Sequence, residues 1–474
     1  LTWDGIRGRV IEEFYARAPP GALEPSALLR CDGEAAARLE SLIAEARQRC
    51  QERKADTTPV QVARLASLLD LRGQHKEALD VLGELGPEST LPEAGKLLRK
   101  IIERHVALAS QRSERELRTE APEELSVPIV DAASVSAQDF SRRFIEPGLP
   151  CVLRGAGVAP DWSAGYLGKR LGRRYVPLRR RCNHPLKWAR MELAGTARFK
   201  DFAAELVARE KAGGPEEAVE RAQVFDYSIW QSCADALADE VRIPRWFCTD
   251  LYSYCSGRIH PITGSASPTL FLADAGSSSG LHVDFLQTHF WMALCRGRKR
   301  WRLVPREDLA LLYPKYLVDL NPSFPFELDA IGEGSASHQA LRHVRVGEVI
   351  LEPGDLIFIP RGWAHQVENL EATVALSANF IDGSNLEAAH SEAELLGLVS
   401  EDPRVFAGEL GEAKILGVPA QLAASAPEDH MPLRAFKARH GETLTPQVTK
   451  RIVGSVVFAV AALGGGAWLS FRHH

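Results

Sequence analysis

The sequence has few cysteines and little net charge. Eight cysteines are scattered through 474 residues, with no C-x-x-C pair and no dense framework. This spacing argues against a cysteine zinc site and predicts a reducing compartment. The formal net charge of −5 gives the molecule as a whole no electrostatic reason to bind nucleic acid or an anionic membrane. The first residue is Leu1 rather than Met, as expected of a fragment or a processed product.

The composition is that of a globular protein with a helical N-terminal region. Hydrophobic residues make up 45% of the chain and charged residues 25%, which is enough for a sizeable core. Residues 1–120 carry apolar residues at helical spacing, as in "ARLASLLDLRGQHKEALDVLGEL", with a turn at Gly73. This segment looks like one tetratricopeptide-type unit, but no second copy follows at a fixed period. A small helical packing domain is therefore predicted.

Short apolar runs separated by Pro and Gly dominate residues 127–382. Stretches such as "PTLFLAD", "THFWMALC" and "HVRVGEVILEPGDLIFIP" are typical of strands joined by tight turns. Their close spacing predicts a barrel or a double-sheet jelly roll. Residues 384–448 return to Ala- and Glu-rich helices and a linker. The predicted fold class is thus α+β, with a jelly-roll core between helical N- and C-terminal regions.

The C-terminal segment has an unusual composition. Residues 452–471 form a run of 20 residues without charge, and 20 helical residues are long enough to cross a bilayer. Cationic residues bracket the run, and Trp468 lies near one end. These features predict a single-pass C-terminal membrane anchor with the catalytic domain on the cytosolic side. The alternatives are a buried terminal helix, and a location in the cytoplasm or nucleus.

The stretch "GLHVD" begins an apolar, strand-like segment with His282 and Asp284. Side chains two apart in a strand point to the same face, so the imidazole and the carboxylate are expected side by side. His365 follows a turn that contains Pro360 and Gly362, where a jelly roll would return it to the first pair.

Two histidines and one carboxylate are the facial triad of non-haem Fe(II) oxygenases, which leaves three coordination positions open. Zinc held by three protein ligands and a water is the chemical alternative at this point. A lone H-x-D pattern is weak evidence by itself, because several of the 14 histidines could satisfy it by chance.

Four motifs in order resemble the JmjC-type oxygenases, specifically their small hydroxylase-like branch with a cupin core. The motifs are "VPIVDAASVSAQDFSRRFIEPGLPCVLRG" followed by "DW", then "GLHVD", "GRKRWRLVP" and "EPGDLIFIPRGWAHQVENL". The resemblance covers about residues 127–382. It implies a double-stranded β-helix fold, with Fe(II) held by His282, Asp284 and His365, and with 2-oxoglutarate and O2 as cosubstrates.

The resemblance also implies how the cosubstrate is held. Lys299 is expected to pair with the distal carboxylate of 2-oxoglutarate, and an ammonium placed after an apolar strand would indeed require an anion. Ser279 and Ser377 are expected to donate hydroxyl hydrogen bonds to the cosubstrate. Where several relatives carry an asparagine, this sequence has Met292, or alternatively His289, which changes the polar contacts expected at the 2-oxo acid end.

The predicted function is an Fe(II)- and 2-oxoglutarate-dependent dioxygenase that hydroxylates a protein side chain or an RNA base and releases succinate and CO2. N-methyl demethylation at the same site is one alternative. It ranks lower because no Cys-rich histone-reader module is present. The other alternative is a membrane-tethered cupin scaffold without turnover.

The stretch from Lys169 to Lys200 contains 11 lysines and arginines against one acid, Glu192. A solvated basic face is the simplest interpretation. The high density of lysines and arginines, in a protein whose net charge is negative, also predicts an anionic partner, such as RNA, an acidic protein or lipid headgroups.

Overall fold

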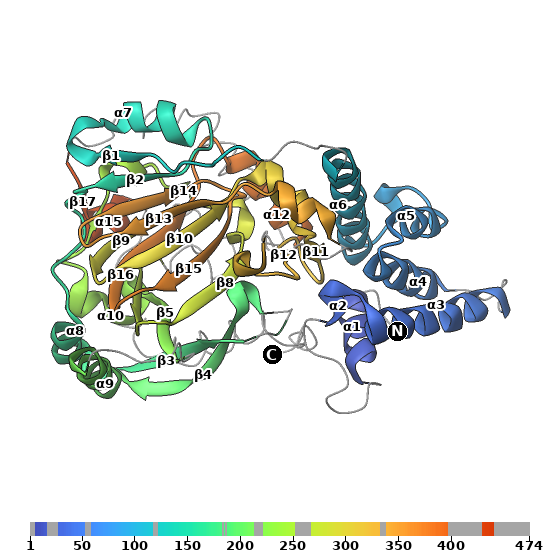
Figure 1. Ribbon diagram of the computed structural model, residues 1–474, viewed down its shortest axis with the longest axis horizontal. Helices are drawn as coiled ribbons and strands as arrows, with labels where there is room; N and C mark the ends of the chain where they lie inside the picture. The colour runs from blue at the N-terminus through green and yellow to red at the C-terminus, as the bar shows by residue number, and fades with distance from the viewer. Residues whose placement is uncertain are drawn as a thin grey trace.

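The computed structural model describes most of the chain. The described residues are 5–16, 27–52, 58–116, 122–182, 184, 187–212, 221–251, 267–331, 338–396 and 429–439. The N-terminal helices lie beside a large β core. Figure 1 shows the two parts side by side along α6 (Glu93–Glu116) and the short strands β11 (Lys315–Tyr316) and β12 (Pro322–Ser323). The predicted α+β class is confirmed.

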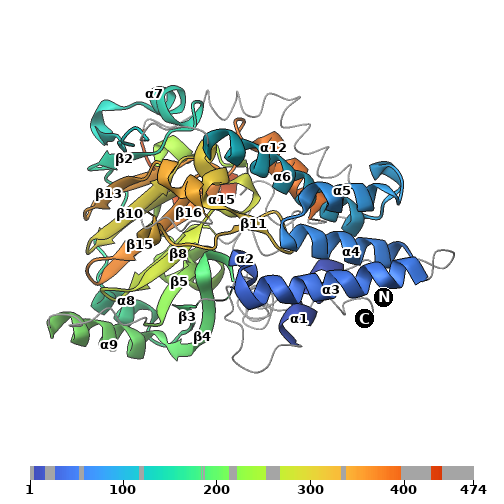
Figure 2. The same cartoon turned by 45° about the vertical axis from the view of Figure 1, so that its right-hand side comes forward.

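The N-terminal helices form a small layered bundle with its own apolar core. The helices are α1 (Ile6–Ala16), α2 (Ala27–Arg30), α3 (Gly33–Glu52), α4 (Pro59–Arg72), α5 (His75–Gly83) and α6 (Glu93–Glu116). Their apolar stripes meet in a buried cluster that includes Leu39, Leu69 and Ile102. The rotated view in Figure 2 shows α3 and α4 running alongside each other. Gly73 ends α4 in the left-handed region with φ 96°, which allows the chain to turn directly into α5.

The larger sheet of the β core has nine strands. They are β1 (Ile129–Asp131), β2 (Cys151–Arg154), β3 (Tyr175–Arg181), β4 (Met191–Arg198), β5 (Gln223–Ser228), β7 (Thr269–Ala273), β9 (His289–Arg296), β14 (Leu356–Ile359) and β16 (Thr373–Phe380). Their spatial order is β1-β2-β14-β9-β16-β7-β5-β3-β4. The β1–β2 pair is parallel, and the pairings that join β2 to the rest of the sheet are antiparallel.

A four-stranded sheet faces the larger one and completes the double-stranded β-helix. Its strands are β8 (Ser278–His282), β10 (Lys299–Val304), β13 (Gly347–Leu351) and β15 (Ala364–Asn369), in the order β13-β10-β15-β8. One buried cluster joins the inner faces, with Phe290 and Met292 from the larger sheet against Trp301 and Val367 from the smaller. This is the aligned packing of two sheets over a shared apolar core.

Helices cover the outer face of the nine-stranded sheet. They include α7 (Ala137–Phe140), α8 (Ala164–Leu171), α9 (Phe199–Lys211) and α10 (Ile229–Leu237), and the short α15 (Leu433–Arg439) joins the same layer. Leu167, Phe202 and Leu237 from these helices pack with Leu272 and Leu376 of the sheet in one cluster. The sheet is therefore buried on both faces, which leaves the space between the two sheets as the protected interior.

A buried polar network joins the helical region to the β core. Arg7 donates from Nε to the Leu317 carbonyl at 2.5 Å and forms an ion pair with Asp70 at 2.7 Å. His105 Nδ1 lies 2.9 Å from both Asp70 oxygens, and its Nε2 accepts from the backbone N–H of Tyr316. β11 (Lys315–Tyr316) is thus anchored on side chains from α1, α4 and α6. Burial by itself would raise the pKa of Asp70, but the attraction of His105 and Arg7 and the hydrogen bonds from both histidines hold it well below its usual range.

The basic stretch from Lys169 to Lys200 is paired only in part within the protein, and an anionic partner for it stays a prediction. Several of its arginines have carboxylate partners on other elements, which are Arg170 with Glu240, Arg174 with Asp235, Arg180 with Glu192, and Arg181 and Arg190 with Glu327. Most of these acids are distant from the stretch in the sequence, but the fold places them next to its arginines. Glu240, Asp235 and Glu327 therefore reduce the local excess of positive charge, but most of that excess remains.

The membrane-anchor prediction is corrected. Within the described ranges, no helix is both long enough and apolar enough to cross a bilayer. The segment 452–471 lies outside the described residues, as does most of the predicted linker within 384–448. An uncharged run shows that a segment can be buried away from water. It does not show whether lipid or protein would surround the segment. The anchor and the membrane location derived from it are therefore withdrawn.

Candidate metal centre and pocket

The pairing of β8 with β15 brings together two histidines that are distant in the sequence. His282 is the register partner of His365 in this antiparallel ladder. Their ring centroids are 4.2 Å apart, and both side chains are buried. The register shifts between His365 and Val367, so the ladder is irregular beside this pair. The third member, Asp284, follows the end of β8 and is also buried.

The three side chains converge on one point. One ligand atom from each of His282, Asp284 and His365 lies within 4.8 Å of the other two. His282 Nδ1 donates to the Gly280 carbonyl at 2.7 Å, and His365 Nδ1 is 3.2 Å from the Trp363 carbonyl. With Nδ1 occupied by the backbone, Nε2 of each ring carries the lone pair for a metal.

The protonation states of the cluster suit a cation. Burial, with some repulsion from His365, lowers the pKa of His282 well below its usual range, so the ring is neutral near pH 7. Burial raises the pKa of Asp284, and attraction from His365 and a hydrogen bond from Asn379 oppose that rise. Asn379 is itself fixed by donating to the Thr288 hydroxyl at 2.9 Å. A divalent cation would compensate the buried carboxylate and bind a ring nitrogen of each imidazole.

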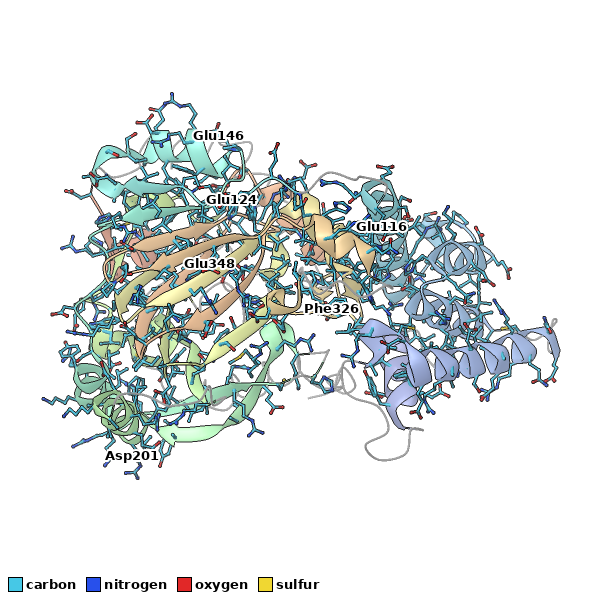
Figure 3. All side chains as sticks on the ribbon, in the orientation of Figure 1. Glu116, Glu124, Glu146, Asp201, Phe326 and Glu348 are labelled. Carbon is cyan, nitrogen blue, oxygen red and sulfur yellow. The ribbon has the colours of Figure 1, made fainter. Side chains whose placement is uncertain are left out.

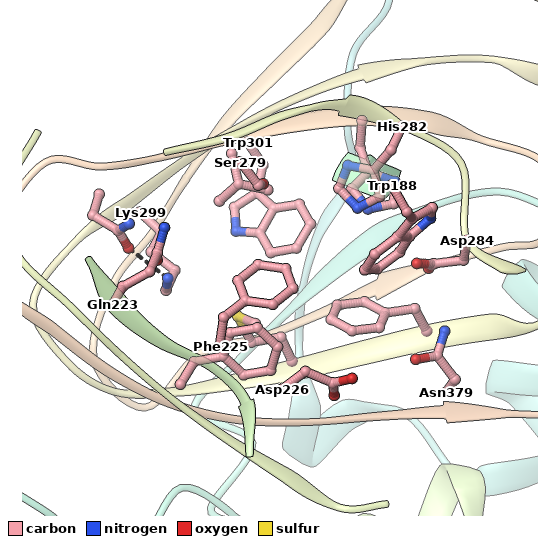
Figure 4. Close-up of a pocket in the computed structure, with 16 residues that line it drawn as sticks. Trp188, Gln223, Phe225, Asp226, Ser279, His282, Asp284, Lys299, Trp301 and Asn379 are labelled. Atoms are coloured by element: carbon pink, nitrogen blue, oxygen red, sulfur yellow. Dashed lines mark hydrogen bonds between the residues drawn. The ribbon is translucent and has the colours of Figure 1, made fainter. Parts of the chain in front are cut away.

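Lys299 lies at the other end of the same pocket from Asp284, as Figure 4 shows. Its side chain is 3% exposed, and Nζ donates to Asn369 Oδ1 at 2.5 Å. Burial lowers the pKa of Lys299 to about 7. Among the described residues no carboxylate forms an ion pair with it. The neutral Asn369 amide does not compensate the charge of this buried ammonium, so the ammonium is suited to bind an anionic ligand.

The pocket between these two ends includes some of the predicted cosubstrate residues. It contains about 600 Å³ of space between protein atoms, part of it open to solvent, and Ser279 and Met292 line it. Ser377 is not part of this lining, because its hydroxyl is buried 3.1 Å from Thr269 Oγ1. The structure therefore places Ser279 in the pocket lining and Ser377 beside it, opposite Met292 on the neighbouring strand, and the cosubstrate roles of both serines stay predictions.

Several lining residues were missed by the sequence analysis. Gln223 lies near Lys299 and Ser279, and its amide donates to the Ser278 carbonyl at 3.2 Å. Asn369 aims the Lys299 ammonium, and it is itself held by the Ser277 carbonyl and the Thr373 hydroxyl. Asn369 lies four residues after His365 at the end of β15, which was an available but unspecific signal.

A glycine in the metal motif allows an aromatic residue to reach the site. A Cβ on Gly280 would lie 2.3 Å from Cγ of Arg190, so β8 has room for the neighbouring segment only because this residue lacks a side chain. That segment carries Trp188, whose indole N–H donates to the Val283 carbonyl at 3.1 Å. The Trp188 ring meets the His282 ring edge-on, with centroids 4.8 Å apart. Trp188 therefore forms a wall of the pocket beside one histidine.

A second group of potential ligands among the described residues does not suit a metal. Asp70, His75 and His105 also place ligand atoms within 4.8 Å of one another. The guanidinium of Arg7 already pairs with the Asp70 carboxylate at 2.7 Å, and both histidines point Nδ1 at the same carboxylate. A cation there would be repelled by Arg7, so the group is better explained as the polar network at the junction with the β core.

A family model described as "Cupin-like domain" matches residues 137–385. This range contains both facing sheets apart from β1, together with the pocket. The match agrees with the double-stranded β-helix seen in the structure.

Individual proteins of known name match smaller regions. The 2-oxoglutarate and iron-dependent oxygenase JMJD4 of Gallus gallus is 33% identical over 121 residues, 25% of this chain and 27% of that protein. JMJD4 of Mus musculus is 24% identical over 270 residues, 53% of this chain and 60% of its own length. The bifunctional arginine demethylase and lysyl-hydroxylase psr-1 of Caenorhabditis elegans is 24% identical over 284 residues, 55% and 62% of the two chains. In each case the chain spans less than two thirds of the relative.

Proposed function

The chain belongs to the cupin-like domain family, and on that premise we propose that it is an Fe(II)- and 2-oxoglutarate-dependent dioxygenase that hydroxylates a protein side chain, with release of succinate and CO2. The observation that carries the proposal is the arrangement of the pocket. Two imidazoles and a carboxylate converge at one end, and a buried ammonium lies at the other.

The donor set suits iron. Two histidines and one carboxylate are the ligands of non-haem Fe(II) oxygenases, and His282, Asp284 and His365 are the residues that would hold the metal. The metal, when bound, would supply activation of dioxygen coupled to oxidative decarboxylation of 2-oxoglutarate. The same donors also suit zinc, but a zinc hydrolase gives no reason for a buried lysine at the far end of the pocket. Lys299 therefore favours the oxygenase.

The protein's own residues would fix the cosubstrate. The Lys299 ammonium would pair with one carboxylate of 2-oxoglutarate, and this pairing would stabilise the protonated form that burial disfavours. Ser279 and Gln223 lie beside Lys299 and can donate further hydrogen bonds. Because Met292 offers no donor, the cosubstrate would be held mainly from the Lys299 end.

The apolar walls would exclude water from the reacting atoms. Phe290, Trp301 and Met292 line the pocket and belong to the core between the two sheets. Restricting water in this way strengthens electrostatic contacts and limits side reactions of reactive oxygen chemistry. The backbone hydrogen bonds of His282 and His365 keep both rings oriented while substrates enter and leave.

The names of the relatives support a protein substrate. The psr-1 protein is named as a lysyl-hydroxylase and arginine demethylase, and a 31% identical relative from Arabidopsis thaliana is named as an arginine-specific demethylase. N-methyl demethylation is therefore the second candidate, because the same site serves both reactions. An RNA base and a scaffold without turnover have no comparable support.

The test is iron binding together with succinate formation. Purified protein is loaded anaerobically with Fe(II), the retained metal is measured, and succinate is then quantified after addition of 2-oxoglutarate and oxygen. We expect one iron per chain and 2-oxoglutarate-dependent succinate. Mass spectrometry of captured protein substrates separates the two candidates, since hydroxylation adds about 16 Da whereas demethylation releases formaldehyde. Absence of both iron retention and succinate would refute the oxygenase.

A further inference from the structure

The strand β5 departs from regular alternation beside the metal centre. Val224 pairs with Leu272 and Tyr227 with Leu270, so Phe225 and Asp226 together oppose the single residue Phe271. This is a β-bulge, and Asp226 has φ 58°, in the left-handed region. In a regular strand, Phe225 and Asp226 would face opposite sides.

The bulge adds a carboxylate to the pocket. Phe225 and Asp226 both line the pocket, whereas Val224 and Tyr227 on either side of them point into the core under the helices. Figure 4 shows Asp226 across the pocket from His282. Asp226 is exposed by accessible area, whereas its carboxylate is surrounded closely enough by protein atoms to be desolvated. A non-glycine residue in a left-handed conformation costs free energy, and such residues are found preferentially at functional sites.

The surroundings of Asp226 leave its carboxylate in need of a cation. Desolvation by the pocket walls raises its pKa, and a hydrogen bond from Thr269 and the attraction of Arg179 oppose that rise. No ion pair is present between Arg179 and Asp226 in the part of the chain that the structure describes. Asp284 also contributes negative charge to this pocket, but that charge would be used by a bound metal. A cationic side chain of a substrate would therefore favour the ionised form of Asp226, and an anionic one would be repelled.

Aromatic rings near the carboxylate complete a site for a cation. Trp188 is 40% exposed and lies 6.2 Å from Phe225, centroid to centroid, in an edge-to-face arrangement. A carboxylate beside aromatic faces attracts ammonium and guanidinium groups, while the rings accommodate an aliphatic stem. The combination fits a lysine or arginine side chain better than an uncharged one.

We propose that Asp226 is the specificity-determining residue that selects protein substrates whose target side chain is cationic, lysine or arginine. The proposal rests on the proposed function, because it assumes that substrates enter this pocket. The bulge in β5 places the carboxylate in the pocket, and Trp188 and Phe225 line the same pocket.

The test uses oriented peptide libraries that share random flanks and a fixed central residue: Lys, Arg, norleucine or Glu. Binding is measured without oxygen, in the presence of Fe(II) and 2-oxoglutarate, to the wild type, Asp226→Asn and Asp201→Asn. Asparagine tolerates the left-handed region, so Asp226→Asn removes the charge and keeps the bulge. Asp201 is an exposed acid on α9 at the edge of the molecule (Figure 3) and is not among the pocket-lining residues, so it is the matched control.

We expect the wild type and Asp201→Asn to bind the Lys and Arg libraries about fivefold or more tightly than the norleucine library, the range of a partly desolvated charge contact. Asp226→Asn should lose this preference and bind all uncharged and cationic libraries alike. Unchanged preference in Asp226→Asn would overturn the proposal, as would absence of any charge preference in the wild type. Equal loss of every library, norleucine included, would show a structural role and overturn it as well.

Iron retention and 2-oxoglutarate binding of Asp226→Asn keep this test separate from that of the proposed function. Both should be retained, because the side chain is not among the three metal donors or at the Lys299 end, and loss of its charge only removes a repulsion on Asp284. If the wild type forms succinate but shows no charge preference, Asp226 has been assigned wrongly while the oxygenase stands. If the wild type neither retains iron nor forms succinate, the oxygenase itself fails.

Discussion

His282 lies directly opposite His365 in the ladder between β8 and β15, with the two rings 4.2 Å apart. Because each ring bonds the backbone through Nδ1, both Nε2 atoms are free to bind one metal. His365→Ala should therefore abolish iron retention and succinate formation while the protein stays folded, since one ligand is lost but little core area. Metal analysis and circular dichroism check this, and His390→Ala on α12 (Leu386–Leu395) is the histidine control outside the pocket. Full iron retention in His365→Ala would exclude it as a ligand.

Lys299→Met should have opposite effects on binding and stability. Methionine has a similar shape but no charge, so 2-oxoglutarate binding should weaken by about 2–5 kcal/mol through loss of the buried charge partner. The free energy of unfolding of the ligand-free protein should rise, because a poorly compensated buried ammonium is removed. Asn369 Oδ1 keeps its hydrogen bond from Thr373 in this variant. Calorimetry and chemical denaturation measure the two quantities, and unchanged 2-oxoglutarate affinity would assign the carboxylate contact to another residue.

The affinity for 2-oxoglutarate should depend on pH through Lys299. Burial lowers the pKa of the ligand-free lysine to about 7, and a bound carboxylate would raise it again. Binding then takes up a proton above pH 7, so affinity should fall by about tenfold per pH unit above that value and be nearly constant below it. Calorimetric titrations from about one pH unit below this pKa to about two units above it test the slope. The Lys299→Met variant should lose this slope, and a wild-type profile that is flat would contradict the assignment.

Gly280→Ala should disturb the pocket although the residue binds nothing. The added Cβ would lie 2.3 Å from Cγ of Arg190, so the segment that carries Trp188 must move or the strand must shift. We expect a loss of about 1–3 kcal/mol in the free energy of unfolding, the usual range for overpacking. Indole fluorescence should also change if Trp188 leaves His282. Gly383→Ala is the matched control, because a Cβ at this position would meet no neighbouring atom within 4 Å.

Asp70→Asn should destabilise the junction between the helical region and the β core. The substitution leaves Arg7 buried without its ion-pair partner, which typically costs about 3–5 kcal/mol. Chemical denaturation measures the loss, and Glu93→Ala, which breaks the exposed pair with Lys96, should change stability by less than about 0.5 kcal/mol. Equal stability of Asp70→Asn and the wild type would show that the network does not hold the junction together.

The sequence by itself determined the elements that depend on local pattern. Apolar spacing predicted the N-terminal helices, and strand-like runs predicted the β core. His282 and Asp284 do meet, but β8 ends at His282, so strand alternation is not what brings Asp284 there. The order of the motifs pointed to His365 and Lys299. Local patterns carry this information because side-chain periodicity in helices and strands is a local property of the backbone.

Tertiary structure decided the features that depend on what surrounds a residue. Counting charges along the sequence overestimated the net positive charge around the basic stretch, because Glu240, Asp235 and Glu327 on other elements pair with its arginines. Ser377 shares a face of β16 with Asn379, yet it is not among the lining residues, and its hydroxyl lies 3.1 Å from Thr269 Oγ1. Asp226 could not be found from spacing at all, because alternation predicts that it faces away from Phe225, and only the bulge opposite Phe271 turns both into the pocket.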